Sequence, residues 1–214
     1  MQVVLVHGLG RTPLSMFGLA AALRRAGHRT RFFGYLGLLE SVSRIVLRLA
    51  RLLHSLARRN QPVGLVGHSL GGLLLRAAVA AVPTLKIHHL ICLGTPQVPP
   101  RMARWAWQWW PPFRVLASDC GRWLLSEQRM AQLPPLHGFP FTLVVGTAGP
   151  RRRWLPLGDT ENDWIVTVDE CRLPGVEPVR VRAWHGFLMD HPAVQHLIVT
   201  MMTSDTSHST PYRD

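Results

Sequence analysis

A serine lies between glycines in the segment Gly67-His68-Ser69-Leu70-Gly71, which four mostly apolar residues precede. This G-x-S-x-G spacing is typical of a sharp turn between a strand and a helix, where a strained backbone lifts the serine hydroxyl above the sheet. The residues two before and two after the serine must be small, because larger side chains would collide across the turn. A helix that begins at Leu70 would also direct its N-terminal amides at negative charge formed beside the serine. The pattern predicts that Ser69 is a nucleophile.

A serine nucleophile needs a base, and in this arrangement the base follows an acid further along the chain. His185 comes directly after a predicted strand over residues 179–184, and Gly186 leaves room for a turn. His191 is the alternative, but it lies nearer the start of the last predicted helix. We therefore expect His185 to be the base.

The acid should follow the predicted strand that ends at Val145. The loop GDTENDWIVTVDECRLPG offers five carboxylates: Asp159, Glu161, Asp163, Asp169 and Glu170. Asp163 is followed by Trp164-Ile165-Val166, an apolar run that could pin the loop against the sheet. We favour Asp163, with Asp159 as the alternative.

An acyl-transfer site also needs two backbone amides to stabilise the oxyanion. One should belong to Leu70, directly after the nucleophile. The other should come from the loop HGLGRT after the first strand, where the amide of Leu9 can face the site. Gly8 and Gly10 leave that backbone free to approach, and we expect His7 to brace the loop.

Strand-like and helix-like segments alternate along the chain. Predicted strands cover residues 2–6, 30–33, 63–67, 89–93, 141–145 and 179–184. Predicted helices cover residues 13–26, 41–58, 70–82 and 192–202, and Ser41 or Ser43 can cap the second of them. This alternation predicts one α/β domain over residues 1–202, with a parallel sheet covered on both faces and a polar tail at 203–214.

One long excursion, residues 97–140, separates two predicted strands and holds five of the eight tryptophans. Tryptophan and arginine interleave in its segment RMARWAWQWWPPFR, which suits a patch that meets a lipid surface. The same rings could instead pack over the sheet edge as an ordinary loop and helix. We expect the excursion to shape the substrate site or to cover it as a lid.

The chain is strongly basic, with 24 Lys and Arg against 12 Asp and Glu, a formal net charge of +12. This charge fits a solvated surface or attraction to an anionic membrane or acidic substrate. The sequence lacks zinc-finger spacing and RNA-binding aromatic motifs, so we expect no nucleic-acid partner. The three cysteines are widely spaced and show no metal-binding pattern, and Cys92 is expected to be a small buried residue.

The N-terminal apolar run stops at His7 and Gly8, too early for a signal peptide, and no stretch reaches the roughly 18 apolar residues of a membrane span. We therefore expect a cytoplasmic protein with no signal peptide in this chain, peripheral at a membrane if it meets one.

Five segments together resemble the α/β-hydrolase superfamily, and especially its small bacterial triacylglycerol lipases and esterases and the related lipase-like deacylases. They are VVLVHGLG, GHSLGG, LGTP, NDWIVTV and AWHGFLM. The resemblance runs from residue 2 to about residue 200. It departs at Trp164, where such lipases often have a glycine or an Asp-Met pair after the acid.

The resemblance implies an α/β-hydrolase fold with a minimal sheet of about six mostly parallel strands. It also implies an acyl hydrolase that needs no cofactor and no metal, with Ser69, Asp163 and His185 as the triad and Leu9 and Leu70 as oxyanion donors. We expect their neighbours His68, Trp164 and Leu188 to contact a small-molecule or lipid ester. An acyltransferase, thioesterase or lactonase would use the same triad, and a non-catalytic lipid-binding module is the alternative of a different class.

Overall fold

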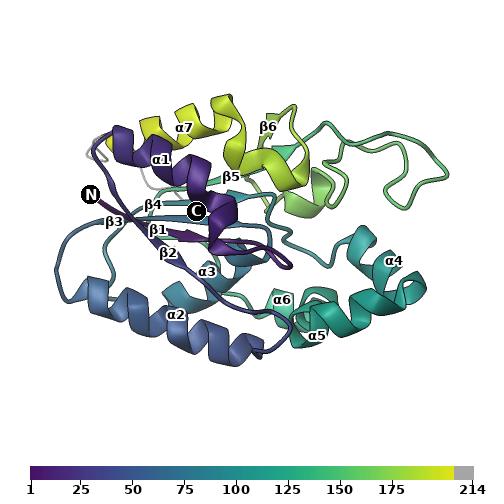
Figure 1. Cartoon of the computed structure of the whole chain (residues 1–214), viewed down its shortest axis with the longest axis horizontal. Coiled ribbons are helices and arrows are strands. Elements are labelled where there is room, and N and C mark those ends of the chain that lie inside the picture. Colours follow the sequence, from purple (N-terminus) through teal and green to yellow (C-terminus); the bar gives the residue numbers. More distant parts are fainter. Residues whose placement is uncertain (205–214) are drawn as a thin grey trace.

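Six parallel strands form the centre of the molecule (Figure 1). The computed structural model describes residues 1–204. The strands are β1 (Gln2–Val6), β2 (Arg29–Phe33), β3 (Val63–His68), β4 (Ile87–Leu93), β5 (Phe141–Gly146) and β6 (Val179–Val181). Their order in the sheet is β2-β1-β3-β4-β5-β6, and every neighbouring pair is parallel. The expected α/β-hydrolase architecture with six strands is confirmed.

Helices cover both faces of this sheet (Figure 1). On one face lie α1 (Phe17–Arg25) and α7 (Pro192–Thr203), and on the other lie α2 (Val42–Ala57) and α3 (Leu70–Ala80). Alternate residues of a strand point to opposite faces. Accordingly, Val3 and Leu5 belong to the hydrophobic cluster under α1 and α7, whereas Val4 and Val6 belong to the cluster under α2 and α3.

Helix α2 follows its predicted pattern closely. The Ser41 hydroxyl accepts a hydrogen bond from the amide of Arg44 (3.3 Å), which caps the first turn. Ile45, Leu49 and Leu53 are fully buried on one side of the helix. Their burial in the main core cluster, where α2 packs beside α3, stabilises the helix more than its intrinsic propensity does.

The excursion at residues 97–140 carries three helices, α4 (Arg101–Trp109), α5 (Pro111–Leu125) and α6 (Glu127–Ala131). The buried guanidinium of Arg76, on α3, contacts the Gln97 side chain and donates to the carbonyl of Pro134 (2.9 Å). One side chain of the central fold thus holds both ends of the excursion.

Two predicted elements differ from the observed ones by more than two residues at one end. The helix expected at 13–26 begins with a separate 3-10 turn, Pro13–Met16, before α1. The last strand ends at Val181 instead of Trp184, because the amide of Ala183 turns back to the carbonyl of Val181 (2.8 Å). His185 therefore does not follow a strand directly, but begins a 3-10 helix, His185–Asp190.

The predicted tail at 203–214 lies almost entirely outside the described residues. Within residues 1–204, none of the helices combines the length and the apolar character that a membrane crossing requires.

Candidate active site

Ser69 lies at the turn between β3 and α3, with backbone angles of φ 52° and ψ −122°. This region is sterically unfavourable for a residue with a Cβ atom. The turn is held because the Ser69 amide donates to the carbonyl of Leu93, at the end of the neighbouring strand β4 (2.7 Å).

This turn requires glycine at both flanking positions, because a side chain at either one would collide with the neighbouring backbone. A Cβ atom at Gly67 would lie 2.5 Å from the backbone of Gly72, and one at Gly71 would lie 2.4 Å from the carbonyl oxygen of Val6. Real Cβ atoms do not come this close to backbone atoms. The two glycines let α3 start directly against β1 and β3, which leaves the Ser69 side chain above the carboxyl ends of the strands.

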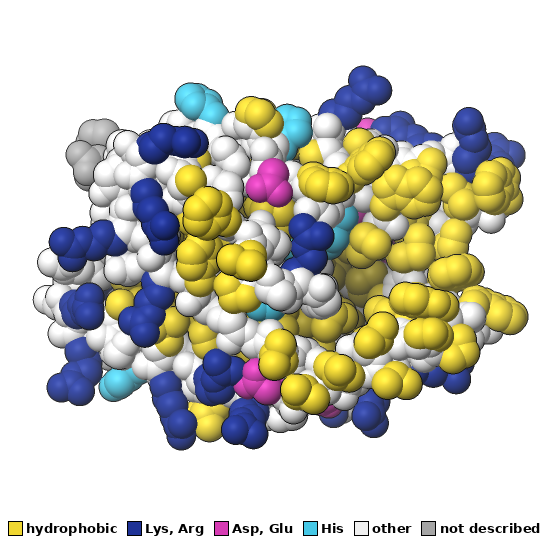
Figure 2. Space-filling model, viewed as in Figure 1, with side chains coloured by type: hydrophobic (Ala, Val, Ile, Leu, Met, Phe, Trp, Pro, Cys, Tyr) yellow, Lys and Arg dark blue, Asp and Glu magenta, His cyan; other side chains and the backbone are white. Residues whose placement is uncertain are grey.

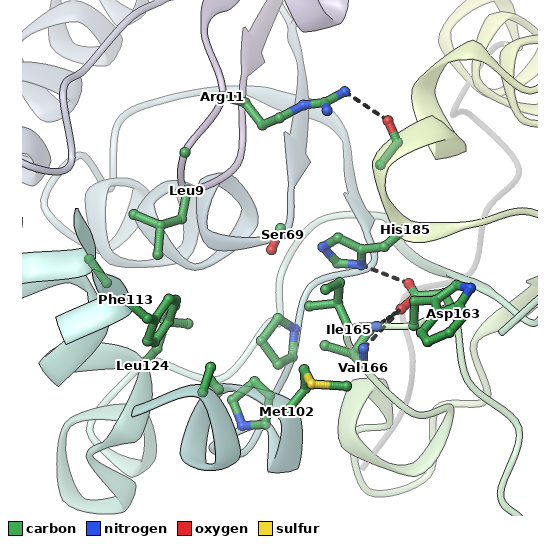
Figure 3. A pocket seen from close by; sticks show the side chains of 18 of the residues that line it. Leu9, Arg11, Ser69, Met102, Phe113, Leu124, Asp163, Ile165, Val166 and His185 are labelled. Atoms are coloured by element: carbon green, nitrogen blue, oxygen red, sulfur yellow. Dashed lines mark hydrogen bonds and ion pairs between the residues drawn. The ribbon is translucent and has the colours of Figure 1, made fainter. Parts of the chain in front are cut away.

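His185 and Asp163 form a buried hydrogen-bonded pair beside Ser69 (Figure 3). The imidazole donates from Nδ1 to Oδ2 of Asp163 at 2.7 Å. Asp163 is fully buried and His185 is 7% exposed. A Cβ atom at Gly94 would lie 2.9 Å from the imidazole, so the glycine after β4 leaves room for the ring.

The second carboxylate oxygen of Asp163 is held by its own loop. Oδ1 accepts from the amides of Ile165 (3.0 Å) and Val166 (2.8 Å), and the amide of His185 donates to the carbonyl of Asp163 (2.9 Å). Each carboxylate oxygen thus has a donor, and these donors stabilise the ionised group in the buried site.

In Figure 3 the His185 ring lies between Ser69 and Asp163, and the ring nitrogen that Asp163 does not bind faces Ser69. Both side chains line one cavity. Among residues 1–204, no hydrogen bond joins the Ser69 hydroxyl to the imidazole. Such bonds are often long without substrate and tighten when it binds. The arrangement can serve chemically as a hydroxyl, a base and an orienting acid.

The alternatives left open by the sequence lie elsewhere. The Asp159 side chain is 63% exposed and pairs with Arg153 (3.3 Å). His191 caps α7, where its Nδ1 accepts from the amide of Ala193 (3.3 Å). Neither residue lines the cavity that contains Ser69.

The loop after β1 comes very close to Ser69. A Cβ atom at Gly8 would lie 2.7 Å from the imidazole of His68 and 3.1 Å from the Cβ of Ser69. Among residues 1–204, the amides of Leu9 and Leu70 have no hydrogen-bond acceptor. Two free donors therefore flank the turn at the positions that the sequence predicted.

His7 braces this loop, as expected. Its Nδ1 donates to the carbonyl of Gly8 (2.9 Å), and its Nε2 accepts from the amide of Tyr35 (3.3 Å). The His7 ring also stacks on Tyr35, with centroids 4.3 Å apart. Burial lowers the pKa of His7, which favours the neutral ring that this pattern requires.

His68 contacts the His185 loop rather than open space. Its Nε2 donates to the carbonyl of His185 (2.9 Å), so the neutral ring leaves Nδ1 as an unpaired acceptor. Burial lowers the pKa of His68 well below its usual range, and the nearby His185 lowers it further. Although its ring reaches the cavity wall, His68 is only 2% exposed.

The expectation that Leu188 contacts substrate is wrong. Leu188 is fully buried in the cluster under α1 and α7 and does not line the cavity. The 3-10 helix that begins at His185 turns it toward the sheet. Its neighbour Phe187, 58% exposed, lines the cavity instead.

The cavity measures about 720 Å³ and has two walls (Figures 2 and 3). Helices α4 and α5 form one wall. Residues 163–166 and 184–187, which carry Asp163 and His185, form the other. Most lining side chains are apolar or aromatic, including Met102, Phe113, Leu124 and Ile165.

Sequence reasoning missed Arg11 and the individual lining residues of α4 and α5. Arg11 lines the cavity and donates to the carbonyl of Gly186 (2.8 Å), which links the loop after β1 to the His185 loop. A signal for α4 was present, because Arg101, Arg104 and Gln108 recur at helical spacing and leave apolar residues on the other side of the helix.

The described residues hold no cluster of three or more His, Cys, Asp or Glu side chains that could bind a metal ion. Cys92, Cys120 and Cys171 are buried and unpaired. Burial raises the pKa of Cys92 and of Cys120 to about 11, so neither is a thiolate at neutral pH.

A parallel α/β sheet with a serine on a strained strand-to-helix turn, next to a buried His–Asp pair, is the architecture of an α/β hydrolase. The family model described as "Alpha/beta hydrolase family" matches residues 3–213. This chain therefore belongs to the alpha/beta hydrolase family. No curated protein matches its sequence.

Solved structures share the fold at low sequence identity. A lipase of Bacillus licheniformis, BlEst2 in its mature form, is 20% identical with a TM-score of 0.72, over 95% of this chain and 92% of that one. A protein of the alpha/beta hydrolase superfamily from Xanthomonas campestris is 17% identical with a TM-score of 0.59, over 95% and 99%. Phospholipase PlaB of Legionella pneumophila is 16% identical with a TM-score of 0.64, over 80% of this chain but 44% of that one.

Replacing Gly71 by alanine should destabilise the protein, because the added methyl group would strike the backbone of β1. We expect the unfolding free energy in urea to fall by about 1–3 kcal/mol. Gly186→Ala is the matched control, since its methyl group would have no neighbour closer than 3.6 Å. Equal stability of the two variants would contradict the steric argument.

The stability of the protein should decrease as the pH falls below about 6.5. Folding lowers the pKa values of His7 and His68, and that of His89 to about 4, so the unfolded chain binds more protons in this range. Urea unfolding at a series of pH values measures the slope. His68→Gln should flatten it, and His54→Gln, which removes an exposed imidazole, should not. A stability that rises on acidification would refute the linkage.

Proposed function

We propose that this protein is a serine esterase that cleaves carboxylic esters with apolar groups. The Ser69 hydroxyl attacks the ester carbonyl carbon while Nε2 of His185 takes its proton. The tetrahedral intermediate then expels the alcohol, which receives that proton from His185. Water, deprotonated by His185, attacks the acyl-enzyme and releases the acid and free Ser69.

The Asp163–His185 contact carries this proposal. The 2.7 Å hydrogen bond from Nδ1 sets the tautomer in which Nε2 is the free base. The buried carboxylate also stabilises the imidazolium that forms when Ser69 loses its proton. The free amides of Leu9 and Leu70 are the proposed donors to the oxyanion.

The cavity supports an apolar ester as the substrate. Its lining is dominated by aromatic and aliphatic side chains, and a volume of about 720 Å³ suits a medium-sized ligand. The lipase and phospholipase among the structural neighbours share the fold and point in the same direction. In this proposal, the helices of residues 97–140 shape substrate choice through the wall formed by α4 and α5.

We also propose that the face around the cavity associates with an anionic lipid surface. Large exposed side chains surround the hollow, and Figure 2 shows them gathered on this side of the molecule. This apolar rim comprises the exposed large side chains that also line the cavity: Trp105, Trp110, Leu116, Trp164, Ile165, Trp184 and Phe187.

Basic side chains lie beside the apolar rim. Arginine and lysine side chains lie at its upper and lower right edges in Figure 2. With 24 basic and 12 acidic residues, the chain cannot neutralise its positive charge internally. Aromatic rings at headgroup depth with cations beside them favour a negatively charged interface.

Ser69→Ala should lower ester hydrolysis by about 10³-fold or more while leaving the unfolding free energy nearly unchanged. Asp163→Asn should lower it about 10³- to 10⁴-fold, because the amide no longer sets the histidine tautomer. Asp159→Asn is the control and should retain full activity. The assay uses nitrophenyl esters of increasing acyl length.

Full activity of the Ser69→Ala variant would end the proposal. Failure of the wild-type protein to react with a fluorophosphonate would favour a non-catalytic lipid-binding module. Faster turnover with thioesters, lactones or alcohol acceptors would assign the same residues to a thioesterase, lactonase or acyltransferase.

The protein should sediment with vesicles of phosphatidylcholine and phosphatidylglycerol, and less with phosphatidylcholine alone. Added salt should weaken the binding because it screens the charges. Trp110→Ser should reduce binding, since Trp110 is 50% exposed and lines the cavity. Leu47→Ser, on the exposed side of α2, should not. Absence of binding to the anionic vesicles at low salt would reject the surface proposal.

A further inference from the structure

Trp164 has a backbone conformation that disfavours its own side chain. Its φ is 85°, in the left-handed region where glycine is at ease and a bulky residue is strained. Only three other non-glycine residues within 1–204 have a positive φ: Asn60, Ser69 and Ser118. Such strain persists only where the surroundings hold it, and it is common at functional sites.

Hydrogen bonds of the two preceding residues, Asn162 and Asp163, hold the turn at Trp164. The side-chain oxygen of the fully buried Asn162 accepts from the Trp164 amide (3.0 Å), and its amide group donates to the carbonyls of Pro150 and Thr160 (3.0 and 2.9 Å). The Asp163 carboxylate accepts hydrogen bonds from the amides of Ile165 and Val166, the two residues that follow Trp164. The turn that places Asp163 against His185 therefore imposes a positive φ on residue 164, whatever its side chain.

The indole itself does little for the fold. It is 44% exposed and lies outside the three hydrophobic core clusters. Within residues 1–204, it stacks on no ring and its N–H group donates to no acceptor, whereas the indole of Trp184 donates to the carbonyl of Ala148 (3.1 Å). The Trp164 side chain lines the cavity.

The position of the indole indicates which part of an ester it would meet. If His185 protonates the departing alcohol, as the proposed function requires, the alcohol must lie on the His185 side of the cavity. Trp164 follows Asp163 directly, and Trp184 precedes His185. Both belong to this wall, whereas α4 and α5 form the opposite wall.

We propose that Trp164 is a specificity-determining residue that binds the alcohol portion of the ester, and that it selects esters of large apolar or aromatic alcohols. This inference rests on the proposed esterase function. The alcohol leaves when the acyl-enzyme forms, so Trp164 acts on acylation. Hydrolysis of the acyl-enzyme takes place after that contact is gone.

Two series of esters test this role by kcat/KM. The first keeps a butanoyl group and varies the alcohol from methanol to phenol to 2-naphthol. The second keeps phenol and varies the acyl length. Trp164→Gly should lower kcat/KM about three- to tenfold for the naphthyl ester and little for the methyl ester. It should leave the dependence on acyl length unchanged.

Trp105→Ala is the matched control on the opposite wall, because Trp105 is 45% exposed and also lines the cavity. It should change the dependence on acyl length and preserve the dependence on the alcohol. Equal losses for all alcohols in Trp164→Gly, or a change confined to the acyl series, would overturn the assignment. A wild-type protein that cleaves no ester in either series would instead refute the esterase function itself.

A stability measurement tests the strain without any substrate. Trp164→Ala and Trp164→Gly both remove the indole, but only glycine relieves the positive φ, so the glycine variant should melt about 2–4 °C higher. At Trp154, which is 80% exposed and has no positive φ, the order should reverse. A lower melting temperature for Trp164→Gly than for Trp164→Ala would refute the strain argument.

Discussion

The close packing of α3 against the ends of β1 and β3 is the constraint on which the site depends. At Gly71, the helix backbone is so near the Val6 carbonyl that a methyl group would have no room. The chain can reach this position only through the positive φ of Ser69, whose amide is fixed to the end of β4. The same closeness brings the Gly8 backbone against Ser69. The ends of three strands thus determine where the hydroxyl lies and which amides surround it.

The residues of this centre could be predicted because each obeys a local rule. Gly67 and Gly71 flank Ser69 because no side chain fits at either position, and this requirement is visible in the sequence as two glycines at fixed spacing. The free amides of Leu9 and Leu70 follow from the positions of two loops at the ends of buried strands. Asp163 and His185 are 22 residues apart, and it was their order after Ser69 that made them candidates. The alternating apolar segments likewise predicted the six-stranded sheet.

The missing details depend on contacts between distant segments. Leu188 was assigned to the substrate site because it lies near His185 in sequence, but a 3-10 helix turns it into the core. The early end of β6 comes from a backbone turn at Ala183, which no residue type marks. Helices α4, α5 and α6 were not predicted, although Arg101, Arg104 and Gln108 recur at helical spacing along α4. The burial of Cys120, Trp123, Leu124 and Met130 in the main core depends on contacts with distant strands and helices. Arg11 reaches Gly186 across 175 positions of the chain.

The two walls of the cavity have different origins in the fold. One is made by the loops that must hold Asp163 and His185, so its backbone is fixed by the hydrogen bonds of Asn162 and Asp163. The other belongs to the excursion, which joins the central fold through Arg76. Its side chains Cys120, Trp123, Leu124 and Met130 also pack into the main core cluster. Trp164 on the first wall lies in a strained turn, whereas the residues of α4 and α5 that line the cavity have helical backbone angles, from which only Ser118 within α5 departs. Substitutions are therefore sterically easier on the second wall, whereas Trp164 places a bulky side chain at a position whose backbone favours glycine.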